Sequence, residues 1–448
     1  MPATDVIVRV APSPTGFLQV GNGRAAVLNA LFARKSGGKF MLRIDDTDPG
    51  RSRVEYELAA IEDYAWLGIT HDLFARASDR VAIYQAAADK LRAAGRLYPC
   101  YETPEELERR RKRQMAAHKP PIYDRAALNL TAEERARLEA EGRKPHWRFK
   151  LTQTKAVWHD LIRGPVEIDT ATQSDPVLIR EDGSFLYMLP SVVDDIEFGI
   201  THIMRGEDHV TNTAPQIEIF EALGAAPPQF AHYALFVGAD GGKLSKRAGG
   251  LSLRDLRAEG IEPLTLASYL AKMGTSDPIE PRLSLDALAN EFAFEKIGRA
   301  LAHFDTAELA LLNGKLLHLL PYDTVAHELT ALGITGGPAF WEAVRPNLTK
   351  LADAVVWQSV VTGPVSPVIE NADLTSKAAT LLPPEPWDET TWGTLTKAVA
   401  DATGAKGRAL FHPLRLALTG RGDGPELKKL LPLIGRARAL ARLNGETA

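Results

Sequence analysis

The chain has 448 residues, 45% hydrophobic and 25% charged, with a formal net charge of −4. This composition is typical of a globular protein with about two to four domains, and it excludes a protein coated uniformly with positive charge for nucleic acid. One cysteine, Cys100, excludes an intramolecular disulfide and a zinc site built from several cysteines. Since no apolar run has the length of a membrane span and the signal-peptide pattern is missing, we expect a cytoplasmic protein with no membrane partner.

The first fifty residues alternate between strand-like and helix-like segments. The run VIVRV (6–10) predicts a strand, and a turn rich in proline and glycine follows it. Segment 24–38 places its apolar side chains on one helical face and ends at two glycines, while KFMLRI (39–44) predicts the next strand. Strand, turn, helix and strand predict a parallel, doubly wound α/β sheet with ligands at the carboxyl ends of its strands.

The composition changes twice further along the chain. Segment 101–150 contains two charged helical stretches around KPPIYD, followed by the aromatic strand HWRFKL, and we interpret it as an insertion that interrupts the sheet. The α/β pattern returns in the segment 183–224. After about residue 250 the chain is mostly helical, with proline and glycine clusters between the predicted helices.

Four segments could carry chemistry. In PSPTGFLQVGNGR (12–24), small residues directly before a helix allow the backbone to approach a ligand, and a helix N-terminus attracts phosphate; a tight connection without a ligand is the alternative. In GKLSKRAGG (242–250), two lysines between glycines could neutralise phosphate charge, or form a solvated basic loop.

The other two segments carry acids and an arginine. The three acids of RIDDTD (43–48) could bind magnesium, a ribose or an ammonium group, or cap a turn. In HIMRGEDH (202–209), Arg205 could bind a carboxylate in bidentate fashion or form a structural salt bridge with Glu207 or Asp208.

Taken together in this order and spacing, the segments resemble bacterial-type glutamyl-tRNA synthetase, a class I aminoacyl-tRNA synthetase. The most specific matches are the run 191–224 and the KLSKR loop, and further similarity extends through 252–274 and 406–440. The resemblance implies a Rossmann-like parallel-sheet catalytic domain with an inserted α+β subdomain, followed by an all-α half. The implied boundaries are 1–100 and 186–240 for the catalytic domain, 101–185 for the acceptor-binding insertion, 241–315 for the KLSKR loop and stem-contact region, and 316–448 for the anticodon-binding region.

The resemblance also implies the site residues. The catalytic residues would be Gln19, Lys243 and Lys246. ATP would be bound by Pro14, Thr15, Gly16, Gln19, Gly21, Asn22, Lys243, Leu244, Ser245 and Lys246. Glutamate would be bound by Arg9, Ala11, Ser13, Asp45, Tyr187 and Arg205, with Arg205 assigned to its side-chain carboxylate.

The implied reaction has two steps. Glutamate and ATP form glutamyl-adenylate with Mg²⁺ present, and the terminal ribose of tRNA then takes the glutamyl group. The partners would be L-glutamate and tRNA-Glu, either alone or with tRNA-Gln, and a monomer is the family expectation. The excess of Lys and Arg in 401–448 and the run RRRKR (109–113) would then contact tRNA, although a solvated helix face is the more common explanation for either stretch by itself.

Three positions depart from the family pattern. Zinc is improbable because Cys100 cannot replace several cysteine ligands. Asp45 stands where relatives often have glutamate, and glutaminyl-tRNA synthetases also have Asp-Asp-Thr here, although their C-terminal half is a β-barrel. Gln19 replaces the first histidine of the signature; losing one charge-assisted hydrogen bond costs roughly 1.5–3 kcal/mol, so we expect a slower enzyme.

Two alternatives remain open. A catalytically silent paralogue that binds tRNA for regulation predicts an ATP pocket degraded beyond Gln19. A short relative that glutamylates a modified tRNA base would lack the helical C-terminal half.

Overall fold

The computed structural model describes residues 5–238, 241–242 and 252–448. These residues fall into two compact units. The first contains the chain up to Ala258 together with Leu266–Asp305, and the second contains Glu259–Thr265 together with Thr306–Ala448.

The first unit is built on parallel strands. β1 (Ile7–Val10), β2 (Lys39–Ile44) and β3 (Leu73–Arg76) form a parallel sheet in that order. The second sheet has the order β7–β6–β10–β9, in which β10 (Gln229–Tyr233) is parallel to β9 (His202–Gly206) and β6 (Lys155–Asp160), while β7 (Gly164–Asp169) is antiparallel to β6.

The two sheets adjoin at the start of β1. The N–H of Thr201 donates to the carbonyl of Ile7 at 2.9 Å, and the N–H of Ile7 donates to Thr201 Oγ1 at 2.9 Å. The parallel α/β core predicted from the first fifty residues is therefore confirmed.

Helices flank these strands. Helix α1 (Val20–Ser36) corresponds to the helix predicted over 24–38. It begins four residues earlier, at Val20, so that Gly21 and Asn22 belong to its first turn. It ends at Gly37, whose φ of 62° is the left-handed conformation that glycine favours at a helix end. The helices of this unit are α1 (Val20–Ser36), α2 (Val54–Trp66), α3 (Val81–Ala93), α6 (Met188–Glu197), α7 (Val210–Ala222), α8 (Leu253–Ala258) and α10 (Leu285–Glu291), with α9 (Pro263–Lys272) at its boundary.

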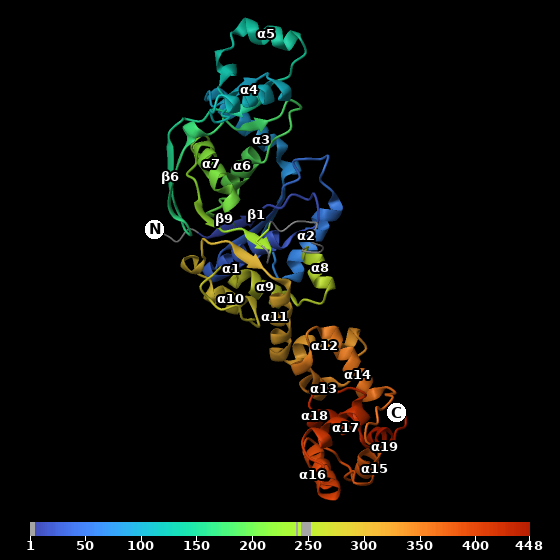
Figure 1. Cartoon of the computed structure of the whole chain (residues 1–448). Coiled ribbons are helices and arrows are strands. Elements are labelled where there is room, and N and C mark those ends of the chain that lie inside the picture. Colours follow the sequence, from blue (N-terminus) through green and yellow to red (C-terminus); the bar gives the residue numbers. More distant parts are fainter. Residues whose placement is uncertain (1–4, 239–240, 243–251) are drawn as a thin grey trace. The chain divides into compact units, whose positions relative to one another are not determined.

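The segment after β4 (Leu97–Cys100) forms the predicted α+β insertion. Helices α4 (Pro104–Ala116) and α5 (Ala132–Ala140) each begin with a threonine whose hydroxyl accepts the N–H of a glutamate three residues on. An antiparallel sheet of β4, β5 (His146–Phe149) and β8 (Val177–Ile179) accompanies them, and Figure 1 shows α4 and α5 apart from the sheets that contain β1 and β9. However, β6 and β7, from the same stretch of sequence, belong to the second sheet, β7–β6–β10–β9, which we call the main sheet. A short parallel pair, β11 (Phe236–Gly238) and β12 (Ala302–Phe304), completes the strands.

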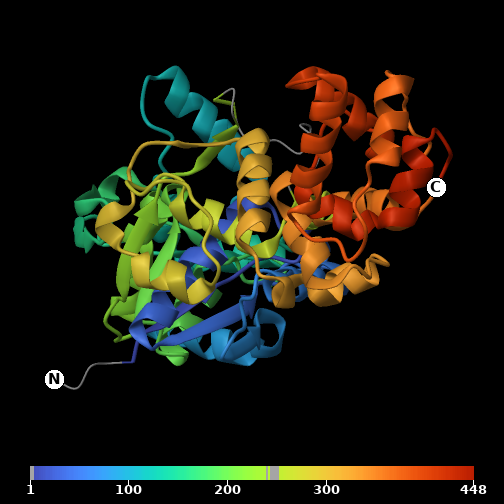
Figure 2. The same cartoon turned by 90° about the horizontal axis from the view of Figure 1, so that it is seen from below.

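The regular elements of the second unit are all helices, as the sequence predicts for this half. Its core contains the fully buried Phe340 and Trp341. Arg442 is also fully buried, and its Nη1 donates to the carbonyls of Val360 and Leu418 at 2.8 Å each. Both views show these helices gathered around one another (Figures 1 and 2). They are α11 (Thr306–Leu319), α12 (Tyr322–Ala331), α13 (Gly337–Val344), α14 (Ala354–Thr362), α15 (Ala372–Thr380), α16 (Thr391–Thr403), α17 (Arg408–Thr419), α18 (Leu427–Ile434) and α19 (Arg436–Leu443).

Within the ranges that the structure describes, no helix combines the length and the apolar character needed to cross a membrane.

Candidate active site

The turn between β1 and α1 ends directly at a helix N-terminus. The N–H of Gln19 donates to the side-chain oxygen of Asn22 at 3.1 Å, and the Gln19 amide donates to the carbonyl of Phe17 at 3.1 Å. Gly21, in the first turn of α1, faces open space, since a Cβ built there would meet no atom within 4 Å. The N–H groups of the first turn that this capping arrangement does not use can therefore approach an anionic ligand.

Two adjoining cavities surround this turn. The first, of about 310 Å³, lies at the carboxyl ends of β1, β2 and β9; the second, of about 570 Å³, lies along residues 11–19. The predicted residues that line the first are Arg9, Ala11, Gly21, Asn22, Asp45, Tyr187 and Arg205. Those that line the second are Ala11, Ser13, Thr15, Gly16, Gln19, Asn22, Asp45 and Tyr187. Four of the predicted residues line both cavities, which joins the two into one site.

Pro14 is the exception among the described residues. It is buried and lines neither cavity, while its carbonyl accepts the N–H of Arg53 at 2.9 Å. Its contribution is to hold the turn against the start of α2.

Lys243, Leu244, Ser245 and Lys246 lie outside the described residues. The next described residue, Ser252, forms an antiparallel bridge with Gln19, and the N–H of Leu253 donates to the carbonyl of Leu18 at 2.9 Å. The chain that follows the KLSKR segment is therefore anchored on the turn before α1.

Arg9 enters the first cavity from β1. Its Nε and Nη2 donate to the two carboxylate oxygens of Asp195 at 3.0 and 2.9 Å. Burial alone would lower the pKa of Arg9, but the ion pair with Asp195 raises it above the ordinary value. Its Nη1 has no hydrogen-bond partner in the described part of the chain, so this nitrogen is free to bind a ligand.

Arg205 enters the same cavity from β9, and none of the described acids pairs with it. Its Nη2 donates to Thr213 Oγ1 and to Gln216 Oε1 at 2.7 Å each, and its Nε donates to His232 Nε2 at 3.1 Å. Burial, and after it the positive charge of Arg9, lowers the pKa of Arg205 to about 10. A buried guanidinium held only by neutral groups is a strong attractor for an anion.

The sequence also allows a structural salt bridge between Arg205 and either Glu207 or Asp208. This alternative is wrong, because Arg205 forms no ion pair with either acid, both of which are among the described residues. Glu207 instead pairs with Arg163 at 2.8 Å.

The three acids of RIDDTD have different partners. Asp46 accepts the N–H of Ser78, in the short helix that follows β3, and Asp48 pairs with Arg51 in the local turn, so both have structural partners. Among the described residues, Asp45 accepts a hydrogen bond from the hydroxyl of Thr47 alone, at 3.0 Å, and it lines both cavities. Among these acids, Asp45 is therefore the best placed to meet an ammonium group.

Sequence reasoning missed two arginines of the first cavity. Arg43 lies between Asp194 and Asp195, at 3.6 and 3.5 Å. Arg24 is buried, donates to the carbonyls of Ala234 and Met273 at 2.8 Å each, and has its pKa lowered by burial to about 10. Arg24 is the last residue of the segment 12–24, and Arg43 is the first residue of RIDDTD (43–48). The sequence does not tell which arginines of such a segment are buried.

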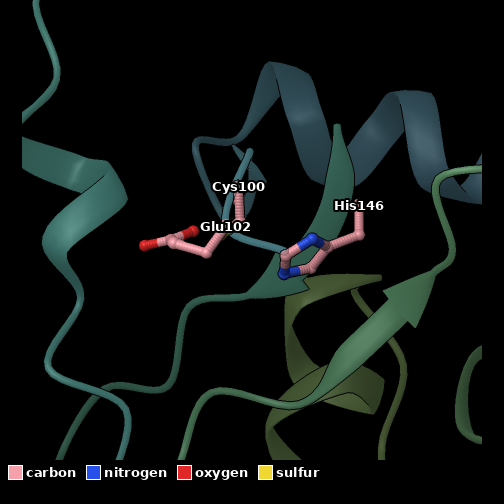
Figure 3. A group of neighbouring side chains, drawn as sticks. All are labelled: Cys100, Glu102 and His146. Carbon is pink, nitrogen blue, oxygen red and sulfur yellow. The ribbon is translucent and has the colours of Figure 1, made fainter. Parts of the chain in front are cut away.

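A separate group lies in the insertion. Cys100 and His146 are opposite each other on β4 and β5, and their ligand atoms and that of Glu102 lie within 4.8 Å of one another (Figure 3). Burial raises the pKa of Cys100 to about 12 and lowers that of His146 to about 4, so both are neutral at pH 7. Three residues with a protonated thiol fall short of the four ligands of a structural zinc site. The absence of zinc stays a prediction.

Known protein families match most of this chain. Residues 5–310 match the family "tRNA synthetases class I (E and Q), catalytic domain", and residues 370–445 match "Anticodon binding domain". The chain is 62% identical to Glutamate--tRNA ligase 1 of Parvibaculum lavamentivorans, over 98% of this chain and 99% of that one. It is 58% identical to Glutamate--tRNA ligase of Azospirillum brasilense, over 99% and 100%. The crystal structure of a glutamate tRNA ligase from Elizabethkingia meningosepticum in complex with its amino acid is similar with a TM-score of 0.86, at 27% identity, covering 98% and 99% of the two chains.

Proposed function

We propose, since this chain belongs to the class I tRNA synthetases (E and Q), that it is a glutamate–tRNA ligase, which uses ATP to attach L-glutamate to the 3′ end of tRNA-Glu. The relatives that bear this name match it over nearly their whole length. The observation that carries the proposal is Arg205, a buried cation without an acidic partner among the described residues, which faces a cavity at the carboxyl ends of parallel strands.

Glutamate binds in the first cavity. We assign its side-chain carboxylate to Arg205 and its other carboxylate to the free Nη1 of Arg9, because guanidinium groups bind carboxylates through charge-assisted hydrogen bonds. Asp45 receives the ammonium group. Ala11 and Tyr187 enclose the substrate together with Ser13 from the adjoining second cavity, and the carbon chain of glutamate spans the space between the two arginines.

ATP binds in the second cavity, as its Mg²⁺ complex. Thr15, Gly16, Gln19 and Asn22 surround the N-terminus of α1, where backbone N–H groups favour phosphate. Pro14 shapes this turn and Gly21 leaves room for the nucleotide. Lys243 and Lys246 neutralise the phosphates, and Leu244 and Ser245 lie between them in sequence.

The reaction proceeds in two steps. An oxygen of the glutamate α-carboxylate attacks the α-phosphorus of ATP, so that glutamyl-adenylate forms and pyrophosphate leaves. A terminal ribose hydroxyl of tRNA then attacks the activated carbonyl, and AMP leaves. The residues of the site contribute orientation and stabilisation of phosphate charge, and no covalent enzyme intermediate is required.

The remaining parts of the chain bind tRNA. We propose that the insertion at 101–185 contacts the acceptor end, that 241–315 contacts the stem, and that 316–448 contacts the anticodon. The Rossmann-like catalytic parts are 1–100 and 186–240. The protein acts as a cytoplasmic monomer, and tRNA-Gln is a second candidate substrate.

The test is charging of purified tRNA-Glu and tRNA-Gln with radioactive glutamate and ATP by the full chain, beside Arg205→Leu. We expect charging of tRNA-Glu by the wild type and its loss in the variant. Charging of tRNA-Gln in the same assay decides the second substrate. Binding of tRNA without any charging by the wild type would overturn the proposal and favour a regulatory paralogue.

A further inference from the structure

Three strands of the main sheet bring together Asp160, His232 and Arg205. Asp160 ends β6, His232 lies on β10, and Arg205 lies on β9, where it is the register partner of His232. Asp160 and His232 are fully buried, and Arg205 is 9% exposed. Neither Asp160 nor His232 lines the cavity, so they act on a ligand only through Arg205.

The two carboxylate oxygens of Asp160 have separate partners. Oδ1 accepts the backbone N–H groups of Ile162, Arg163 and His232 at 3.0, 3.0 and 3.1 Å. Oδ2 lies 2.5 Å from Nδ1 of His232. Burial alone would raise the pKa of Asp160, but these hydrogen bonds lower it to about 2, so the group is a carboxylate at neutral pH.

These contacts define the tautomer of His232. The carboxylate of Asp160 can only accept a hydrogen, so Nδ1 of His232 must carry one. On the other side of the ring, Arg205 Nε donates to Nε2 at 3.1 Å, and an arginine keeps its proton, so Nε2 must be unprotonated. Burial lowers the pKa of His232, with the hydrogen bond to Asp160 opposing the shift, which agrees with a neutral ring.

The arrangement leaves one side of Arg205 available. Nε is held by His232 and Nη2 by Thr213 and Gln216, while Nη1 has no hydrogen-bond partner in the described ranges. Asp160 supplies a negative charge one imidazole ring away from the guanidinium. It lies behind the ring and outside the cavity, so it does not occupy the position of a ligand carboxylate.

We propose that Asp160 and His232 are positioning residues for Arg205: the carboxylate fixes the Nδ1–H tautomer of the imidazole, and its Nε2 orients the guanidinium toward the substrate carboxylate. This inference rests on the proposed role of Arg205 in binding glutamate. It adds two residues, 72 positions apart in sequence, to the machinery that sets affinity for the amino acid.

Asp160→Asn separates positioning from folding. The amide oxygen of asparagine can still accept the three backbone N–H groups, whereas its NH₂ group now faces His232 and favours the tautomer protonated at Nε2. That hydrogen would oppose Arg205 Nε–H. We expect the KM for glutamate to rise about 10- to 100-fold, as when the partner that orients a metal-binding histidine is lost, with the KM for ATP unchanged within about twofold.

Two further variants keep the test independent of that single substitution. In His232→Gln, the side-chain oxygen can accept from Arg205 Nε, so we expect a smaller rise in the KM for glutamate than in His232→Leu. Matched controls are Asp169→Asn, at the end of the same β-hairpin, and His159→Gln, exposed beside Asp160 on β6; both should behave as the wild type.

The tautomer is read directly by NMR of ¹⁵N-histidine-labelled full-length protein, with His232→Gln assigning the signal. We expect Nδ1–H in the wild type and a shift toward Nε2–H in Asp160→Asn. An Nε2–H tautomer in the wild type, an unchanged KM for glutamate in Asp160→Asn, or an equal rise in the KM for ATP would overturn the inference. A wild type that charges no tRNA would instead overturn the proposed function, and the tautomer measurement would still test the hydrogen-bond chain.

Discussion

Arg9 on β1 and Asp195 on α6 form a buried ion pair with two hydrogen bonds, Nε to Oδ1 at 3.0 Å and Nη2 to Oδ2 at 2.9 Å. Arg43 approaches the same carboxylate at 3.5 Å. Asp195, 186 positions from Arg9 in sequence, thus contacts two cations that line the first cavity. Asp194 lies 3.6 Å from the second of them, Arg43.

Removing the charge of Asp195 is therefore expected to destabilise the fold. Asp195→Asn leaves Arg9 and Arg43 buried with less compensation, and breaking a buried ion pair typically costs about 3–5 kcal/mol. Urea unfolding followed by circular dichroism measures the change. Asp89→Asn, in an exposed pair with Arg92, is the control and should change the free energy of unfolding by less than about 1 kcal/mol. Equal effects of the two variants would contradict the expectation.

Arg205→Lys tests the guanidinium of the first cavity. A lysine ammonium cannot satisfy His232, Thr213 and Gln216 together and still present a donor to the substrate carboxylate. We expect the KM for glutamate to rise about 10- to 100-fold with the KM for ATP nearly unchanged. Steady-state aminoacylation with each substrate varied in turn gives both constants. Arg76→Lys, which changes a partly exposed guanidinium paired with the buried Glu57 outside both cavities, should leave both constants as in the wild type.

Gln19→His restores the imidazole that the family signature has at this position. Gln19 lines the second cavity directly before α1, and its side-chain amide is held by the carbonyl of Phe17. A cationic histidine would add a charge-assisted hydrogen bond to phosphate, so we expect kcat to increase by about 10- to 150-fold. Steady-state aminoacylation at saturating glutamate, ATP and tRNA measures kcat. Gln85→His on α3 is the control and should leave kcat unchanged. If Gln19→His does not raise kcat either, glutamine serves equally well at position 19.

Gly424→Ala tests a close approach in the second unit. Gly424 has a φ of 127°, and a Cβ there would lie 2.0 Å from an atom of the Trp357 ring. Alanine would be strained in this backbone conformation, and its Cβ would clash with the Trp357 ring. We therefore expect the free energy of unfolding to fall by about 2 kcal/mol or more. Gly393→Ala is the matched control: it lies inside α16 with open space around it, and it should stabilise by about 0.5–1 kcal/mol. Calorimetry of the full chain distinguishes the two signs.

Asp63 on α2 is expected to make the free energy of unfolding depend on pH. It is fully buried, neither carboxylate oxygen has a hydrogen-bond partner among the described residues, and burial raises its pKa to about 6, with Arg254 opposing the shift. The folded state therefore binds this proton more tightly than the unfolded state, whose Asp pKa is about 4. The contribution of Asp63 to stability is present below pH 4 and is lost as the pH rises from about 4 to 6.

Asp63→Asn removes this titration. We expect the variant to be more stable than the wild type at pH 8, and the difference to shrink as the pH is lowered below 6. Urea unfolding across this range gives both curves. If the difference in the free energy of unfolding between Asp63→Asn and the wild type does not change with pH, Asp63 does not titrate in this window. Asp79→Asn, at an exposed aspartate, is the control for the effect of removing a surface carboxylate.

Local sequence patterns determined much of the fold. The apolar runs 6–10 and 39–44, with a turn and an apolar helical face between them, predicted the parallel core, and Gly37 marked the end of α1. Both depend on neighbouring residues, because side-chain periodicity and left-handed glycine conformations are local properties. The site residues were named from the family resemblance, and several of them, Arg9, Ser13, Thr15, Gln19 and Asp45, lie at a strand end or in the turn that follows β1.

Tertiary structure alone decided how the charges are paired. The sequence places Arg205 beside Glu207 and Asp208, yet the fold turns it toward His232 and leaves it without an acid among the described residues. It also brings Asp160, from the predicted insertion, into the main sheet, and places Asp195 against Arg9. Burial and ion pairing depend on which strands lie side by side, and strand order is set by packing between segments far apart in the chain.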